Sequence, residues 1–284
     1  MLTPKAKERL ALIILGSIAV LTVAILAITL GYLLAKGLPA INWEFLSQAP
    51  RRMGRQGGIF PFILSTFYLT GVALFLAVPV GVGAAIYLTE YAKVRWLTTT
   101  VRFFTEILAG IPSIVFGLFG FIFFVITLGF GWSLLSGGLT LALMILPTIL
   151  RTAEEAIKTV PYSYREGSLA LGATQGQTIW KIVLPSALPG ILTGIILAVG
   201  RAVGETAAVL LTAGSSVLPP LGLLDSARSL SVHLYILAVE GISTEKAFAT
   251  AVVLITLVLI LNFTATKLVR RLNSNRSEVI WLVK

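Results

Sequence analysis

Long apolar runs separated by short polar segments dominate this chain. A helix needs about 20 apolar residues to cross a bilayer, and six runs approach or exceed that length: residues 10–35, 60–88, 101–128, 134–150, 186–211 and 247–268. The fourth run is the shortest. Pro112 and Ser113 interrupt the third run and predict a bend, because proline removes a helix hydrogen bond. The pattern predicts an all-α membrane protein with six transmembrane helices in a single domain, residues 1–284.

The composition supports a membrane protein and argues against several kinds of site. Hydrophobic residues make up 57% of the 284 residues, charged residues only 12%, and the mean hydropathy is +0.95. The chain has no cysteine, and its one histidine, His233, is interpreted as an ordinary interfacial residue. No G-x-x-x-x-G-K-[ST] motif is present for a nucleotide. We therefore expect no catalytic residues, no metal ligands and no cofactor on this chain.

The basic residues predict which side each loop faces. With both termini inside, 15 of the 22 lysines and arginines fall inside, six fall outside, and Arg201 lies within a span. The inner set is Lys5, Lys7, Arg9, Lys93, Arg95, Arg102, Arg151, Lys158, Arg165, Lys181, Lys267, Arg270, Arg271, Arg276 and Lys284. By the positive-inside rule, the termini and the 161–185 segment should be cytoplasmic.

Two groups of charges outside the main pattern have open interpretations. Arg51, Arg52 and Arg55 fall on the outer side against the trend. They belong either to a plain solvated loop or to a site that attracts an anion arriving from outside. Arg102 and Glu106 stand four residues apart near the inner end of the third run, which predicts a solvated or interfacial pair along one helix.

The segment from Pro161 to Pro185 mixes polar and apolar residues between two strongly apolar runs. The spacing of Ser163 and Glu166 predicts a capping box that opens one short helix. Gly172 stands where a helix end favours a left-handed residue. Thr174 and Gln177 repeat the capping-box spacing and open a second helix. The sequence therefore predicts two short helices joined by a glycine turn.

This segment is more apolar than a solvated loop requires. The apolar positions are Leu169, Leu171, Ile179, Trp180 and Ile182. One interpretation is a helix that fits a groove on a soluble partner. The other is an interfacial helix lying on the lipid, and the pattern alone leaves both open.

The same segment resembles the coupling loop of ABC importer permeases, whose signature is E-A-A, then a glycine, then I-x-L-P. The matching residues are Glu166, Gly172, Ile182, Leu184 and Pro185, while Gly167 and Ser168 stand where the family has two alanines. Gly167 weakens the helix by about 1 kcal/mol relative to alanine. The resemblance implies that this loop is a cytoplasmic coupling helix that contacts a separate ATPase.

Arg201 and Glu205 form the second candidate site, within the fifth apolar run. Charged residues at that depth usually face protein or a water-filled path. A stripe of mostly small residues at helical spacing, Ser186, Gly190, Gly194, Leu197, Arg201, Glu205, Ala208 and Thr212, predicts the buried face. The residues leave open whether Arg201 makes a structural ion pair or contacts an oxyanion with its planar guanidinium.

The surrounding segment GRAVGETAAVLLTAG is similar to the G-R-A-x-G-E-T segment of the phosphate-import permeases PstA and PstC. The likeness covers most of the chain from Gly57 on, and SLSVHLYILA resembles PstA more than PstC. It implies a type I (MetI-like) importer permease of the cell membrane in which Arg201 and Glu205 lie on the phosphate path. It also implies a PstC-like permease, a PstB-like ATPase dimer that holds ATP and Mg²⁺, and a PstS-like phosphate-binding protein as partners.

Two alternatives to a phosphate importer remain at this point. A permease for another oxyanion, sulfate or molybdate, would carry similar residues, because the binding protein normally sets the specificity. A secondary transporter with Glu205 as a proton-coupling carboxylate would usually show internal repeats with paired broken helices, and the sequence shows no convincing repeat.

Overall fold

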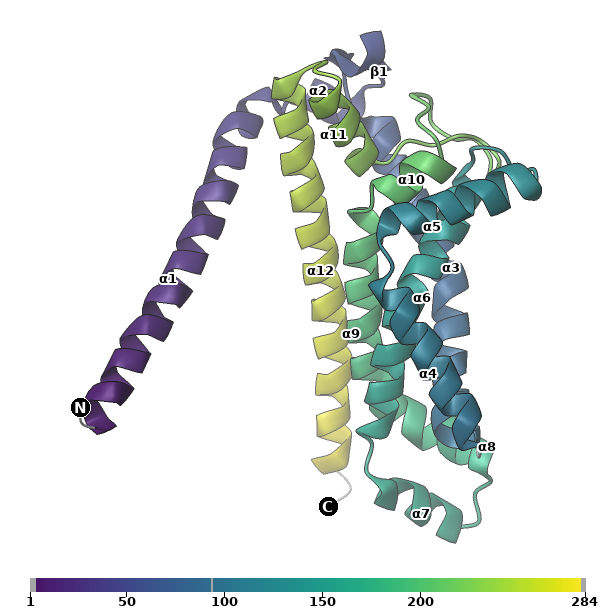
Figure 1. The fold of residues 1–284 in the computed structure, drawn as a ribbon. Coiled ribbons are helices and arrows are strands. Elements are labelled where there is room, and N and C mark those ends of the chain that lie inside the picture. Colours follow the sequence, from purple (N-terminus) through teal and green to yellow (C-terminus); the bar gives the residue numbers. More distant parts are fainter. Residues whose placement is uncertain (1–3, 93, 282–284) are drawn as a thin grey trace.

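The computed structural model describes the backbone of residues 4–92 and 94–281. Its regular structure is helical except for one short hairpin, and most of its long helices run side by side between two ends (Figure 1). We call the end that carries residues 161–178 the loop end and the opposite one the hairpin end. Among these described residues, five helices are long and apolar enough to cross a membrane, or six if one bent pair counts as a span. Lys93 and Lys284, both assigned to the inner side, lie outside the described residues.

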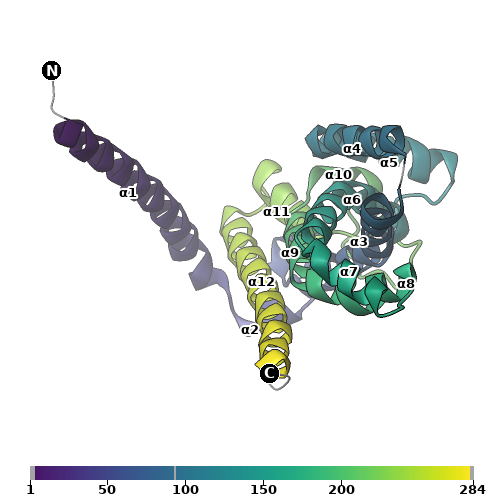
Figure 2. The same ribbon diagram turned by 90° about the horizontal axis from the view of Figure 1, so that it is seen from below.

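Helix α1 (Pro4–Gly37) leaves the rest of the molecule (Figures 1 and 2). None of the residues in its most apolar stretch is buried against the rest of the chain. Contact is confined to its last turns, where the rings of Tyr32 and Phe248 meet edge to face at 5.7 Å. This helix contains the predicted run 10–35 but contributes little to the core.

The core is formed by α3 (Phe60–Ile86), α6 (Leu134–Lys158) and α9 (Leu184–Val203). Glycines bring these helices close, as small residues do in membrane bundles. An added Cβ on Gly81 would lie 2.9 Å from Ile149 Cγ2, and one on Gly190 would lie 2.6 Å from Ala156 Cβ. A π-helical segment, Tyr87–Tyr91, extends α3 at the loop end.

The third apolar run is broken, as Pro112 predicted, but more sharply than a bent helix. Helix α4 (Arg95–Gly110) ends before Pro112, and α5 (Ser113–Gly120) continues as a π-helical segment, Phe121–Thr127. The two parts meet at 102°. Proline cannot supply the backbone N–H that a continuous helix needs there.

Two other helices differ from the predicted runs. The fourth run, 134–150, is the shortest in the sequence but lies in a helix of 25 residues, because α6 continues to Lys158. The fifth run, 186–211, is interrupted: α9 ends at Val203, and a short helix, α10 (Ala207–Thr212), follows. At its N-terminal end, α9 is continuous with helical residues that begin at Gln175. The predicted stripe therefore cannot continue unbroken through Glu205 to Thr212.

Helices α4 and α6 are joined by ion pairs, which corrects the expected pair within α4. Arg102 Nη2 lies 2.6 Å from Glu154 Oε1, and Arg151 Nη2 lies 2.6 Å from Glu106 Oε1. Glu154 is fully buried and also binds Lys158 at 2.9 Å. A buried carboxylate needs such partners, so Arg102 binds across the interface rather than along its own helix.

Short elements build the hairpin end. They are a 3₁₀ turn (Leu38–Ala40), α2 (Trp43–Ser47), the antiparallel strands β1 (Pro50–Arg51) and β2 (Gln56–Gly57), α11 (Leu230–Val239) and the start of α12 (Thr244–Trp281). His233 is not the interfacial residue that we predicted. It is 1% exposed, and its ring stacks on Phe62 at 4.0 Å. Burial, with Arg228 and Lys246 nearby, lowers the pKa of His233 to about 3, so it is neutral here.

The packing of α6 on α9 predicts the effect of a single methyl group. An added Cβ on Gly194 would clash with Thr152, lying 2.6 Å from its Cβ. We expect Gly194→Ala to destabilise the protein by about 1–3 kcal/mol. The loss should appear as a lower apparent melting temperature when the intact fraction is followed by size-exclusion chromatography after heating. Gly71→Ala is the control, because an added Cβ there meets nothing within 4 Å. Equal melting of both variants would contradict the close packing.

Candidate functional site

The 161–185 segment lies across the loop end of the molecule (Figure 1). Its first helix, α7 (Tyr162–Ala170), starts directly after Pro161. The predicted capping box of Ser163 and Glu166 is wrong, because Ser163 is already the second residue of the helix. In the part of the chain that the structure describes, no side chain caps α7.

The glycine turn is confirmed. Gly172 has φ +83°, a left-handed conformation that side chains disfavour. The N–H of Gly172 donates to the Leu169 carbonyl at 3.0 Å, and that of Ala173 donates to the Ser168 carbonyl at 3.2 Å. These two bonds form a Schellman motif, which ends α7 and turns the chain.

The second capping box is also confirmed. Thr174 Oγ1 accepts from the N–H of Gln177, and the Gln177 side chain accepts from the N–H of Thr174. The helix opened in this way, α8 (Gln175–Thr178), continues through a π-helical segment, Ile179–Val183, into α9. The second half of the loop is therefore the beginning of a long core helix.

The signature residues of the loop divide into an exposed and a buried group. Glu166, Gly167 and Gly172 are exposed. Ser168 is buried, and its hydroxyl lies 2.9 Å from that of Thr178. This bond joins α7 to α8 and leaves little room for a longer side chain at position 168. Ile182, Leu184 and Pro185 are partly buried on the helix that leads into α9.

Large apolar side chains on the loop are exposed to solvent in this chain. Leu171 is 90% exposed and Trp180 is 70% exposed, and Leu169 is also exposed. Ile179, in contrast, is buried and belongs to the core. Exposed apolar groups concentrated on one protruding elbow indicate a surface that another molecule covers.

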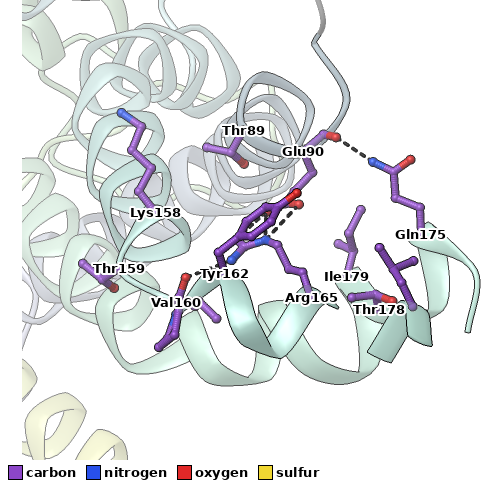
Figure 3. A pocket seen from close by; sticks show the side chains of 12 residues that line it. Thr89, Glu90, Lys158, Thr159, Val160, Tyr162, Arg165, Gln175, Thr178 and Ile179 are labelled. Carbon is purple, nitrogen blue, oxygen red and sulfur yellow. Dashed lines mark hydrogen bonds and ion pairs between the residues drawn. The ribbon is translucent and has the colours of Figure 1, made fainter. Parts of the chain in front are cut away.

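An ion pair that the sequence did not predict holds the loop in place (Figure 3). Arg165 Nη2 lies 2.6 Å from Glu90 Oε1, and these two side chains are only 13% and 10% exposed. Arg165 also donates to the carbonyls of Val160 and Ile157 at 2.8 and 3.1 Å, at the end of α6. Arg165 therefore binds the ends of both α3 and α6 to α7.

Gln175 makes a second link between the same elements. Its Nε2 donates to the backbone carbonyl of Glu90 at 2.6 Å. Around these contacts lies a hollow of 720 Å³, lined in part by Lys158, Tyr162 and Thr178 (Figure 3). We call Glu90, Arg165 and Gln175 the brace. Since residues 90 and 165 are far apart in sequence, no spacing rule could have paired them.

The second candidate site does not contain the ion pair that was considered for it. Arg201 lies in the last turn of α9, and Glu205 lies beyond the helix end. Glu205 Oε1 accepts from the N–H of Ala208 at 3.2 Å, and its backbone carbonyl accepts from Ser231 Oγ. Among the described residues, neither Arg201 nor Glu205 makes an ion pair within 4.0 Å.

The buried face of α9 is displaced from the predicted stripe. The residues buried there are Ala187, Ile191, Gly194, Ala198, Ala202 and Val203. Gly194 is the one residue shared with the prediction within α9, while Ser186 and Leu197 are exposed and Arg201 is half-buried. Arg201 is therefore beside, rather than inside, the packed core of this chain.

Comparison with known proteins gives relatives of similar length. The probable ABC transporter permease protein YqgI of Bacillus subtilis is 33% identical, over 95% of this chain and 99% of its own. The phosphate transport system permease protein PstA of Haemophilus influenzae is also 33% identical, over 81% of this chain and 82% of its own.

Solved structures share the fold. A bacterial alginate ABC transporter, in complex with a pentasaccharide-bound periplasmic protein, has a TM-score of 0.69 at 16% identity, over 94% of this chain and 96% of its own. The MetNI methionine ABC transporter, in an inward-facing conformation, has a TM-score of 0.58 at 24% identity, over 76% of this chain and 94% of its own. Both likenesses show the fold of ABC importer permeases, as the resemblance in sequence implied.

The family model supports the same assignment. The model for the binding-protein-dependent transport system inner membrane component matches residues 77–274, which contain the whole 161–185 segment as well as Arg201 and Glu205. This match covers more than half of the chain. The chain therefore belongs to the family of binding-protein-dependent transport system inner membrane components, and is a multi-pass permease of the inner membrane.

Proposed function

We propose that this chain is the permease subunit of an ATP-driven importer of inorganic phosphate and forms half of its translocation path. Relatives of similar length support this, because several are phosphate transport system permeases. The observation that carries the proposal is the loop: a braced helical elbow with exposed apolar residues at the family's signature position. Such an elbow is suited to receive force from another polypeptide.

The proposed assembly follows from this role. The loop and both termini lie in the cytoplasm, as the distribution of basic residues favours. A PstC-like permease completes the path, and a PstB-like ATPase dimer binds the loop. A PstS-like phosphate-binding protein delivers phosphate from the other side. ATP and Mg²⁺ belong to the ATPase, and this chain itself catalyses no reaction.

The brace suggests how force passes into the membrane. When the ATPases close, they displace the exposed elbow around Glu166 to Gly172. Arg165 and Gln175 transmit that displacement to the ends of α3 and α6, while α8 continues directly into α9. All three core helices are thus moved together, which favours a rigid-body rocking between inward-facing and outward-facing states.

Arg201 is the proposed phosphate contact on the path. Its guanidinium suits an oxyanion because it offers several N–H donors in one plane. Within this chain it has no carboxylate partner in the described residues, so its charge is available. Glu205, on the other side of the helix break, limits how tightly phosphate is held through like-charge repulsion.

Arg201→Gln tests the proposed phosphate contact. We expect ATP-dependent uptake of labelled phosphate into proteoliposomes to fall at least about tenfold, the loss of one charge-assisted contact, with assembly intact. Lys267→Gln removes a charge at the loop end of α12 and should leave uptake unchanged. Near-normal uptake by Arg201→Gln would remove this residue from the path.

Uptake driven by a proton gradient alone, or of sulfate or molybdate in preference to phosphate, would overturn the proposed function itself.

Gly172→Val tests the loop as the ATPase contact. A β-branched residue at φ +83° strains the turn, so we expect less ATPase subunit to co-purify. Gly241→Val is a matched control, because Gly241 also has a positive φ and open space but lies at the hairpin end. Glu166→Lys should weaken the same contact by reversing an exposed charge. Undiminished co-purification of both loop variants would count against the loop.

Glu90→Gln tests the brace. Removing the carboxylate leaves the mostly buried Arg165 without its charged partner, a change that is costly at buried sites. We expect ATP hydrolysis to continue while phosphate uptake falls about tenfold, since about 1.4 kcal/mol of coupling corresponds to that factor. Glu245→Gln, an exposed change at the hairpin end, is the control. Equal losses of hydrolysis and uptake would show that the brace supports assembly rather than coupling.

A further inference from the structure

Residues 50–57 form a charged hairpin at the end opposite the loop (Figure 1). Its strands β1 and β2 are joined by a 3₁₀ turn, Arg52–Gly54. Arg51, Arg52 and Arg55 are all exposed, and none of them makes an ion pair among the residues that the structure describes. Three unneutralised guanidinium groups within five residues make this a positive patch. We call it the arginine hairpin.

The arginine hairpin is rigidly attached to the rest of the chain. Lys246 Nζ donates to the Gly57 carbonyl at 2.6 Å, and Arg55 Nε donates to the Ile242 carbonyl at 3.1 Å. An added Cβ on Gly54 would lie 2.8 Å from Cε1 of the buried His233, so the turn packs directly on α11. The hairpin therefore holds its charges on a fixed support rather than on a mobile loop.

Arg52 has a backbone conformation that its side chain opposes. Its φ is +49°, the one positive value among the non-glycine residues that the structure describes. Glycine or asparagine adopts this conformation more easily than arginine. An arginine here accepts a cost in backbone free energy, which indicates that its charge serves a purpose other than folding.

Two hollows flank the hairpin and share Arg55 and Gln56. One, of 350 Å³, is also lined by Arg51 and Glu44, and the other, of 710 Å³, by Arg52 and Glu240. Both hollows are open to solvent, and each carries a carboxylate beside its arginines. Arginines spread over an open face suit a broad acidic protein surface, which can place its carboxylates away from Glu44 and Glu240, better than they suit a single phosphate ion.

We propose that the arginine hairpin docks an acidic surface of the soluble solute-binding protein, an inference that rests on the proposed function. Opposite charges steer such encounters and fix the register of the two surfaces. The hairpin is also joined to the site of transport. It packs on His233 of α11, and Ser231 of the same helix binds the carbonyl of Glu205. A partner docked on the hairpin would therefore act on α11, the helix that contacts the break between Arg201 and α10.

The test uses the assembled transporter in lipid nanodiscs and the purified phosphate-binding protein encoded in the same genome. The variant is Arg51→Gln with Arg52→Asn, which leaves the structural Arg55 in place and relieves the backbone at position 52. We expect the Kd for the binding protein to rise about tenfold and its salt dependence to weaken. Basal ATP hydrolysis and assembly should stay unchanged. Lys267→Gln, at the loop end, should have no effect on the Kd.

Each other outcome overturns a defined part of the account. An unchanged Kd and salt dependence would exclude the hairpin as the docking surface while leaving the proposed function intact. Direct binding of inorganic phosphate to the transporter, lost in the double variant with no change in the Kd for the binding protein, would make the hairpin an anion site instead. A wild-type transporter that neither binds the protein nor responds to it would contradict the proposed function.

Discussion

The position of the loop depends on the ion pair between Arg165 and Glu90. Arg165 reaches from α7 to the end of α3 and to the last carbonyls of α6, and Gln175 adds a second link to Glu90. Because the pair is largely buried, losing either partner would leave a charge without compensation. With α8 continuous into α9, the loop is linked to all three core helices at this end.

The parts of the fold that local rules govern could be predicted from the sequence. Apolar runs placed most of the long helices, Pro112 marked the break between α4 and α5, and Gly172 marked the left-handed turn. The capping box of Thr174 and Gln177 formed because α8 begins where that spacing requires. The break, the turn and the capping box are each set by residues within one or two turns of each other, and each long helix by a continuous run of apolar residues.

The parts that failed depend on contacts between distant segments. Arg102 was expected to pair with Glu106 along α4, but a fully buried Glu154 on α6 offers a stronger partner. The stripe through Arg201 and Glu205 assumed a continuous helix, whereas α9 ends before Gly204. Beyond that end, the backbone carbonyl of Glu205 accepts from Ser231, and the Glu205 carboxylate accepts from the N–H of Ala208 in α10. The Ser163 box failed because α7 starts at Tyr162, two residues earlier than a cap at Ser163 requires.

The proposed binding of an ATPase to the loop on the cytoplasmic side can be tested by labelling a single introduced cysteine, because the chain has no cysteine of its own. Leu171→Cys places the thiol on a side chain that is 90% exposed, and Leu221→Cys places one on a side chain that is 95% exposed between α10 and α11. With a membrane-impermeant thiol reagent, we expect the Leu171→Cys variant to react only from the cytoplasmic side, and more slowly once the ATPase is bound. The thiol at 221 should react from the opposite side. Labelling of position 171 from outside, or labelling that the ATPase does not slow, would contradict the account.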